Sequence, residues 1–221
     1  MVHLNRVSKH YPGRAGPVLR EVSLQVPRGQ FLYLTGPSGA GKTTIMRLLL
    51  GAELPTRGRV RVGGKDLGRL GPRGLARFRR RVGFVFQDFK LVEGLSVFEN
   101  VALSLRVAGV KGPRLVERVE QVLKQVGLER ASGERIDNLS GGEQQRVAIA
   151  RAMAADPPLI LADEPTGNLD PQNAREVMRL LRSAHARGAT VILATHDPAL
   201  LGLVPGARVV RLAGGRLEEE R

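Results

Sequence analysis

Residues 36–43 form the run Gly-Pro-Ser-Gly-Ala-Gly-Lys-Thr, whose residue types and spacing could hold the phosphates of a nucleotide. The run fits the pattern G-x-x-x-x-G-K-[S/T], which joins a strand to a helix in phosphate-binding loops. Its glycines let backbone N–H groups approach the phosphates, and the N-terminus of the following helix adds partial positive charge. Lys42 is expected to reach the β- and γ-phosphates, and Thr43 to place its hydroxyl on Mg²⁺. The predicted nucleotide-binding residues here are Gly36, Pro37, Ser38, Gly39, Ala40, Gly41, Lys42, Thr43 and Thr44.

Two adjacent acidic residues, Asp163 and Glu164, follow an apolar run in the sequence PLILADEP. Asp163, at the end of the predicted strand, is expected to join Thr43 as a Mg²⁺ ligand, and Glu164 to orient and activate water. Either acid alone would suit a loop or a helix cap. Because they stand together behind a buried strand in a chain with a phosphate loop, the pattern favours a catalytic site.

Polar side chains also follow two other predicted strands. Gln87 comes after residues 81–86, and His196 comes after residues 190–195. Open α/β sheets bind ligands at the carboxyl edge of their parallel strands, so these residues should meet there. We predict a γ-phosphate contact for His196, although a lone histidine is more often structural. Gln87 by itself fits a loop as well as a site.

A second glycine-bearing segment, NLSGGEQQR at residues 138–146, is called the signature segment below. Ser140 and Glu143 fit the S-x-x-E capping box, which alone indicates only a helix start. Gly141 and Gly142 are predicted to leave that start bare, so that an anion can approach its N–H groups. The phosphate loop already surrounds one set of phosphates. The second anion site is therefore most simply explained by the nucleotide of another molecule.

Short apolar runs alternate with helical patterns along the chain, which indicates an α/β protein with a mainly parallel sheet. Residues 1–221 are predicted to form one domain, in which a helical subdomain at about 88–155 is inserted into an α/β core of 1–87 and 156–221. Two alternating runs before the phosphate loop predict an antiparallel β patch at the N-terminus. The predicted strands are 31–36, 81–86, 158–163 and 190–195, and the predicted helices include 43–51, 113–127 and 171–188.

The composition narrows the function classes further. The chain has 221 residues, 42% of them hydrophobic, with a formal net charge of +14 and no cysteine. Disulfides and thiolate metal sites are thereby excluded. No apolar run reaches the length of a membrane span and no signal peptide is evident, so we expect a soluble, intracellular protein. The high net charge fits an anionic partner, and equally a compositional bias or adaptation to heat. The basic cluster Arg77–Arg81 lacks an aromatic platform, which argues against nucleic-acid binding; contact with lipid headgroups and simple exposure to solvent are its alternatives.

Together, these motifs resemble the ATPase subunits of ABC transporters. The resemblance rests on GPSGAGKT, Gln87, LSGGEQQR, LILADEP, the NLD run at 168–170 and His196, in this order. It implies an ABC ATPase fold that binds and hydrolyses ATP with Mg²⁺. It also implies a head-to-tail dimer in which each ATP lies between the phosphate loop of one copy and the signature segment of the other.

The resemblance assigns further residues by their positions in those motifs. The signature residues expected to face the other copy's nucleotide are Ser140, Gly141, Gly142 and Gln144. Asp170 is expected to cross the dimer seam, and Tyr11 to stack on adenine, although a surface tyrosine is the plainer alternative. Gln87 is expected to join the Mg²⁺ and water network and to sense a membrane partner.

Within that family, the runs ADEPTGNLD, VGFVFQDFKLV and LSGGEQQRVAIARA are most similar to the FtsE-type cell-division branch. This implies an FtsX-like integral membrane partner, a peripheral location on the cytoplasmic face of a bacterial membrane, and control of peptidoglycan hydrolysis. A lipoprotein-release or export ATPase and an ATP-gated recruitment module remain alternatives. The DNA-repair ATPases that share this site need a coiled coil or zinc module, and this chain has neither.

Overall fold

The computed structural model describes residues 1–13, 15–167 and 169–219, and a six-stranded sheet forms its centre. The strand order is β10-β9-β3-β8-β7-β6, and the strands from β9 to β6 pair in parallel while β10 runs antiparallel to β9. The bounds are β3 Phe31–Thr35, β6 Val82–Val85, β7 Leu159–Asp163, β8 Thr190–Ala194, β9 Arg208–Ala213 and β10 Arg216–Glu219. The prediction of an α/β fold with a mainly parallel sheet is confirmed.

A second, antiparallel sheet has the order β2-β1-β4-β5 and confirms the expected N-terminal β patch. Its strands are β1 Val2–Lys9, β2 Leu19–Val26, β4 Arg57–Val62 and β5 Lys65–Asp66. In β4, Val60 and Val62 are buried between exposed arginines. The arginines of this short alternating run give it little apolar character, which is why the sequence predicted only β1 and β2.

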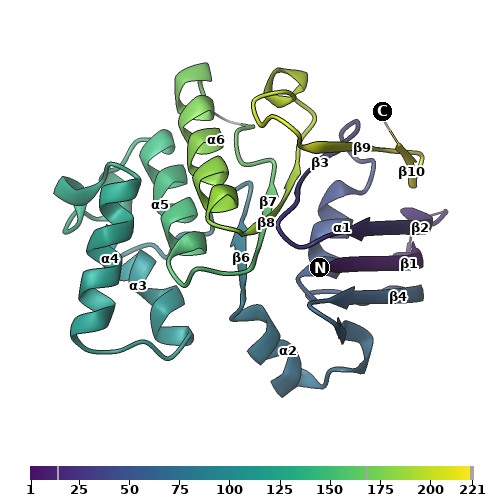
Figure 1. Cartoon of the computed structure of the whole chain (residues 1–221), viewed down its shortest axis with the longest axis horizontal. Coiled ribbons are helices and arrows are strands. Elements are labelled where there is room, and N and C mark those ends of the chain that lie inside the picture. Colours follow the sequence, from purple (N-terminus) through teal and green to yellow (C-terminus); the bar gives the residue numbers. More distant parts are fainter. Residues whose placement is uncertain (14, 168, 220–221) are drawn as a thin grey trace.

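Six α-helices complete the described part of the chain. They are α1 Lys42–Leu49, α2 Pro72–Arg79, α3 Val97–Val107, α4 Pro113–Gln125, α5 Gly141–Met153 and α6 Pro171–Ala186. Figure 1 shows α3, α4 and α5 together at one end of the molecule and the β1–β2–β4 sheet at the other; β6, β7 and β8 lie between them, while β9 and β10 reach the end that carries β2. The helices predicted at 113–127 and 171–188 end before Gly127 and Gly188, as expected.

Residues 88–155 contain α3, α4, α5 and two short 3-10 helices, with no named strand among these residues. Helix α5 contacts α3 and α4 on one side and β6 and α6 on the other. The helical segment thus shares a hydrophobic core with one face of the sheet. Whether residues 88–155 behave as a separate subdomain stays a prediction. No helix in the described ranges combines the length and apolarity that crossing a bilayer requires.

The central strand β3 is buried along its whole length because both of its faces are covered. Phe31 and Tyr33 join the core shared with the helical segment, while Leu32 and Leu34 join the core formed with α1 and the antiparallel sheet. Strands β7 and β8 are likewise fully buried. This double burial explains their continuous apolar runs and fixes the carboxyl ends from which the polar residues of the site emerge.

Candidate functional site

The residues predicted from five separate segments line one cleft of about 550 Å³. They follow β1, β3, β6, β7 and β8, so the parallel strands present their carboxyl ends to a common space. The lining consists of Tyr11, Val18, Ser38, Gly39, Gly41, Lys42, Thr43, Thr44, Arg47, Gln87, Glu164 and His196. Gly36 and Pro37 line a neighbouring cavity of about 470 Å³ with Ser38 and His196, and Ala40 and Asp163 belong to neither lining.

The phosphate loop (residues 36–43) depends on two glycines with strongly positive φ. Gly36 has φ +139°, and a Cβ there would lie 2.2 Å from the carbonyl oxygen of Leu212. Gly41 has φ +109°, and a Cβ there would press on Leu19 at 3.0 Å. Gly41 is also the N-cap of α1 and provides no side-chain cap. The first N–H groups of α1 are therefore left for a ligand, as anion binding requires.

Lys42 is buried and finds its partners within the loop and the acidic segment. Its Nζ donates to the carbonyl oxygens of Gly36 at 2.7 Å and Pro37 at 3.2 Å, and pairs with Glu164 Oε1 at 3.2 Å. The side chains of Lys42 and Glu164 are only 6% and 10% exposed. Such a desolvated charge needs a counter-charge, which Glu164 supplies.

Glu164 is held in place by its backbone and by two charged or polar neighbours. Its φ of +47° is unusual for a residue with a side chain and lies in the left-handed region. Its N–H donates to Ala194 O at 3.0 Å, which ties it to the end of β8. Its Oε2 lies 3.0 Å from His196 Nδ1, and the His196 side chain is 53% exposed. The carboxylate therefore stands between a buried cation and an open imidazole.

Asp163 has the properties of a cation ligand. Its Oδ1 is buried without a hydrogen-bond partner, and the Thr43 hydroxyl bonds to the same carboxylate. Burial raises the pKa of Asp163, the Thr43 hydrogen bond lowers it, and the charge of Glu164 raises it again. A hard cation such as Mg²⁺ prefers oxygen ligands of this kind.

The rest of the donor set also suits Mg²⁺. Gln87, after β6, lines the same cleft as Thr43. The described residues contain no group of three or more His, Asp or Glu side chains that could hold a metal. Mg²⁺ needs no such cage, because it is usually bound by one or two carboxylates together with substrate phosphates and water. Thr43, Asp163 and Gln87 therefore fit this ion.

The signature segment begins α5 as predicted. Ser140 is the N-cap, its Oγ accepts from Glu143 N at 3.4 Å, and Glu143 Oε2 accepts from Ser140 N at 2.9 Å. Gly141 is exposed, as the expected bare helix start requires. The expectation is wrong for Gly142, which is buried: a Cβ there would lie 2.5 Å from Asn173 Oδ1.

Asn173 covers Gly142 because the first turn of α6 holds it there. Asp170 caps α6 by accepting from Gln172 N and Asn173 N at 2.9 and 3.0 Å, and it also bonds the Asn173 side chain. Arg146 donates to Asn173 Oδ1 at 3.0 Å. These contacts join the Asp170 turn to the signature helix within one chain. No local pattern links positions 142 and 173, so the sequence could not predict this packing.

The signature residues stand apart from the cleft. Ser140, Gly141, Gly142, Gln144 and Asp170 are absent from its lining. Gln144 donates to the carbonyl oxygen of Leu139 at 3.1 Å, within its own segment. Asn168, of the NLD run, lies outside the described residues. The chain therefore brings most of the expected phosphate-side groups into one cleft and leaves the signature residues and Asp170 outside it.

The sequence did not predict three residues in or near the cleft, Val18, Arg47 and Glu53. Arg47 lines it from α1, one helical turn after Thr43, and this spacing of four residues was the signal available in the sequence. Glu53 bonds the Tyr11 hydroxyl at 2.6 Å. It stands 42 residues further along the chain, and only the fold brings the two together.

Comparisons with known proteins agree with this geometry. The sequence model of the family described as ABC transporter matches residues 19–167. The cell division ATP-binding protein FtsE of Mycobacterium tuberculosis is 45% identical over 223 residues, which cover 100% of this chain and 96% of that protein. FtsE of Bacillus subtilis is 41% identical over 215 residues, which cover 97% and 93%.

A solved structure supports the same assignment at the level of the fold. The dimeric post-hydrolysis state of the ATP-binding cassette MJ0796 bound to ADP and Pi superimposes with a TM-score of 0.91 at 37% identity, covering 100% of this chain and 99% of that one. The matches to the Mycobacterium tuberculosis protein and to MJ0796 cover the whole chain and so include every segment that lines the cleft. The chain belongs to the ABC transporter family of ATP-binding proteins.

Proposed function

We propose that this chain is an FtsE-type ATPase subunit of a cell-division system, in which two copies clamp ATP and Mg²⁺ between them and act on a membrane partner. The observation that carries the proposal is that the expected nucleotide-binding residues lie in two separate places on the chain. Most of the phosphate-side groups, including Lys42, Thr43 and Glu164, line one cleft, while the signature groups lie outside it. ATP hydrolysis is the activity of the family, and the two relatives reported above, from Mycobacterium tuberculosis and Bacillus subtilis, are named for cell division.

The phosphate loop and Lys42 would bind the ATP phosphates, and Thr43, Asp163 and Gln87 would hold the metal. Bound Mg²⁺ supplies charge neutralisation at the β- and γ-phosphate oxygens. Glu164 would then accept a proton from water as the water oxygen attacks the γ-phosphorus. The bond from that phosphorus to the ADP oxygen breaks, and ADP and phosphate are the products.

The ion pair between Lys42 and Glu164 suggests how binding prepares this step. At 3.2 Å the ammonium neutralises the same carboxylate that must later accept a proton. A γ-phosphate would compete for Lys42 and leave Glu164 free to hold water. His196, with Nδ1 3.0 Å from Glu164 Oε2, would keep the carboxylate oriented and reach the γ-phosphate.

The second copy would supply the remaining contacts. Ser140, Gly141 and Gln144 would approach the other copy's nucleotide, and Asp170 would cross the seam. Gly141 and Ser140 are exposed, so they can be reached by another molecule. The related MJ0796 cassette is described as a dimer with ADP and Pi.

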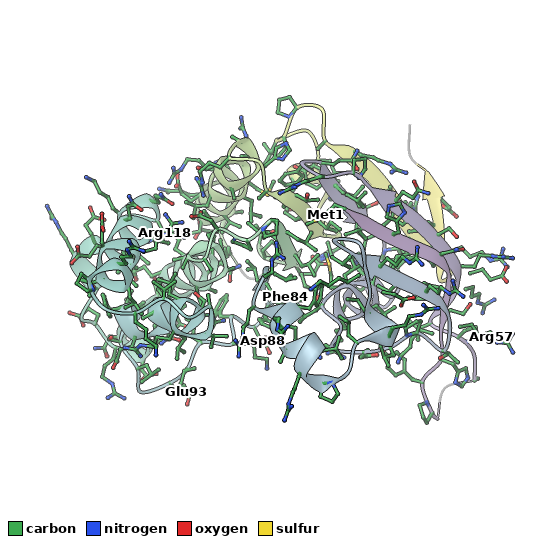
Figure 2. All side chains as sticks on the ribbon, turned by 60° about the horizontal axis from the view of Figure 1, so that its bottom comes forward. Met1, Arg57, Phe84, Asp88, Glu93 and Arg118 are labelled. Carbon is green, nitrogen blue, oxygen red and sulfur yellow. The ribbon has the colours of Figure 1, made fainter. Side chains whose placement is uncertain are left out.

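A groove of about 560 Å³ offers a place for the membrane partner. Its apolar lining comes mainly from β6 and α3, and includes Phe84, Phe86, Leu103 and Val107. Basic side chains of Arg79, Arg80, Lys90 and Arg151 complete the lining. In Figure 2, Phe84 and Asp88 lie between the helical end, marked by Arg118, and the end marked by Arg57.

Consecutive residues of the chain line this groove and the nucleotide cleft. Phe86 lines the groove, and the next residue, Gln87, lines the cleft. A change in the position of Gln87 when Mg²⁺ and the γ-phosphate bind would therefore be passed to Phe86, and so to a partner segment bound in the groove. The partner that we propose is an FtsX-like integral membrane protein, which would hold this chain at the cytoplasmic face of the membrane.

Because the chain has no cysteine, a single introduced thiol can identify that partner. Val107→Cys places a thiol in the groove at a side chain that is 54% exposed, and Val116→Cys places one on α4 at 43% exposure as the matched control. After cross-linking in membranes of the source cell, we expect only Val107→Cys to capture an FtsX-type protein. Capture of a lipoprotein-release or export protein instead would refute the cell-division role.

A further inference from the structure

Tyr11 belongs to a charged cluster with Lys9, Arg47 and Glu53, and three of these four residues have no role so far. The Tyr11 hydroxyl donates to Glu53 Oε2 at 2.6 Å and lies 3.4 Å from Thr44 Oγ1. Lys9 Nζ pairs with the same Oε2 at 3.1 Å, and Arg47 pairs with Glu53 Oε1 at 3.4 Å. A single carboxylate thus connects the aromatic ring, α1 and the end of β1.

The ring is fixed on one of its faces. Lys9 Nζ lies 4.9 Å from the ring centroid, within the range of a cation–π contact. The same ammonium donates to Leu54 O at 2.9 Å, so it cannot easily move away. A planar base that stacks on Tyr11, which is part of the cleft lining, would therefore use the opposite face of the ring.

Regular structure does not hold this ring. Tyr11 follows the end of β1 by two residues, and the connection from there to β2 contains no named helix or strand among its described residues. The nearest backbone anchor is the hydrogen bond from His10 N to Thr56 Oγ1 at 3.0 Å. The side-chain contacts to Glu53 and Lys9 are therefore the main restraint on the ring.

The charge states suit such a restraint. Burial and the Glu53 hydrogen bond raise the pKa of the Tyr11 phenol. Burial opposes ionisation of Glu53, but the hydrogen bonds from Tyr11 and Lys9 outweigh it and lower the pKa of that carboxyl. The phenol therefore keeps its proton and the carboxylate its charge over the neutral range, which gives a short, charge-assisted hydrogen bond.

We propose that Glu53 is a positioning residue for the nucleotide base: its carboxylate holds the Tyr11 ring and the Lys9 ammonium together, so that the free face of the ring is presented to the adenine. This inference rests on the proposed ATP-binding function and on the stacking role of Tyr11. It requires that Glu53 contributes to binding of the base and not to binding of the phosphates.

Inorganic tripolyphosphate, which has the phosphates but no base, separates these contributions. Dissociation constants of the full chain for ATP and for tripolyphosphate, both with Mg²⁺, are measured by calorimetry for the wild type, Tyr11→Leu, Glu53→Ala and the double variant. Stacking on one aromatic ring is worth about 1–3 kcal/mol, so Tyr11→Leu should weaken ATP binding about 5- to 100-fold. We expect a smaller loss, about five- to tenfold, for Glu53→Ala. The double variant should be no weaker than Tyr11→Leu, and tripolyphosphate affinity should stay unchanged throughout.

Each other outcome has a distinct meaning. If Tyr11→Leu leaves ATP affinity unchanged, the stacking role itself fails, and this inference with it. If Tyr11→Leu weakens ATP binding but Glu53→Ala does not, only the inference is overturned. If Glu53→Ala weakens ATP and tripolyphosphate equally, Glu53 acts on the phosphate side and the inference is wrong. Glu176→Gln, at an exposed ion pair with Arg179, is the control for loss of a surface carboxylate.

A second measurement keeps the test independent of the stability of Glu53→Ala. The chain contains no tryptophan and two tyrosines, so in a Tyr33→Phe background the tyrosine fluorescence comes from Tyr11 alone. Adding ATP should change that fluorescence, while tripolyphosphate should not. Lys9→Met, which removes the ammonium from the ring, should reduce the ATP response; an undiminished response would contradict the proposal.

Discussion

The phosphate-loop side of the site consists of buried charges, whereas the signature segment consists of exposed polar groups at a helix start. Taken as whole residues, Lys42, Asp163 and Glu164 are 5%, 5% and 9% exposed to solvent. Lys42 and Glu164 neutralise each other inside one chain. Ser140 and Gly141 face solvent, and Ser140 is satisfied by its own capping box with Glu143.

This difference has a physical origin. A buried charge must be balanced before any ligand arrives, so the phosphate-loop side has to be assembled within the chain that contains it. A helix start at the surface can be satisfied by a side-chain cap or water and needs no further partner until an anion approaches. Substitutions on the phosphate-loop side should therefore weaken ATP binding by a single chain. Substitutions in the signature segment should instead weaken dimer formation and the ATP turnover that depends on it.

The largest effect is expected for Lys42→Ala. It removes the cation of the phosphate loop and leaves Glu164 buried without its partner. ATP affinity should fall at least about 100-fold, since charge-assisted hydrogen bonds contribute about 1.5–3 kcal/mol each. Equilibrium titration with labelled ATP measures this, and circular dichroism shows whether the variant is folded. Unchanged affinity in a folded variant would remove Lys42 from the site.

Glu164→Gln should separate hydrolysis from binding. The amide keeps the shape of the side chain but cannot accept the proton from water, so turnover should fall about 10²- to 10⁴-fold. ATP affinity should be retained, and a dimer with uncleaved ATP should accumulate. Light scattering with Mg²⁺ and ATP measures its mass. A population of ATP-bound monomers alone would count heavily against dimer closure.

The chain contains its own control for the signature serine. Ser140 caps α5 and Ser96 caps α3, both within capping boxes that contain Glu143 and Glu99. Ser140→Ala and Ser96→Ala should each lower the free energy of unfolding by about 1 kcal/mol. Only Ser140→Ala should also reduce ATP turnover and dimer formation, while ATP binding by the monomer persists. Equal turnover in the two variants would mean that Ser140 is only a helix cap.

The smallest effect is a gain in stability for Asp163→Asn. Burial raises the pKa of Asp163 above the value of about 3.9 in an unfolded chain, so the folded state favours the protonated form. Stability therefore falls as the pH rises from the unfolded through the folded pKa, and the full cost remains at higher pH. Without Mg²⁺ at neutral pH, the variant should be about 1 kcal/mol more stable than the wild type.

The pH dependence of the expected gain in the free energy of unfolding is the control for this prediction. Well below the unfolded pKa of about 3.9 the carboxyl is protonated in both states, so the advantage of Asp163→Asn should disappear. The variant should also lose Mg²⁺-dependent ATP turnover. Denaturant melts across pH measure the first effect. A variant that is less stable than the wild type at neutral pH would show that Asp163 is not destabilised by its burial.

Much of the fold was predictable because its main signals are local. The fully apolar runs of β3, β7 and β8 arise from burial on both faces, and the capping residues Ser140 and Asp170 mark the starts of α5 and α6. The strand β4 was missed because its sequence, RGRVRV, is mostly charged outside two buried valines.

The candidate site was predictable where a motif follows the end of a strand, as for the phosphate loop after β3 and Glu164 after β7. Contacts between distant segments were not, because no spacing rule connects them. Asn173 on Gly142, Glu53 on Tyr11 and the pairing of Lys42 with Glu164 all depend on the folded chain. The roles of the signature residues stay predictions, since they concern a second molecule.

One mixing experiment tests the central claim, that each reaction centre is shared between two chains. Lys42→Ala disables the phosphate loop and Ser140→Arg blocks the signature segment, and each folded variant alone should be inactive. In a mixed dimer, the intact loop of one copy meets the intact signature of the other, so ATP turnover should return to at most about half that of the wild type. If the mixed sample stays inactive although heterodimers are present, the shared centre is contradicted.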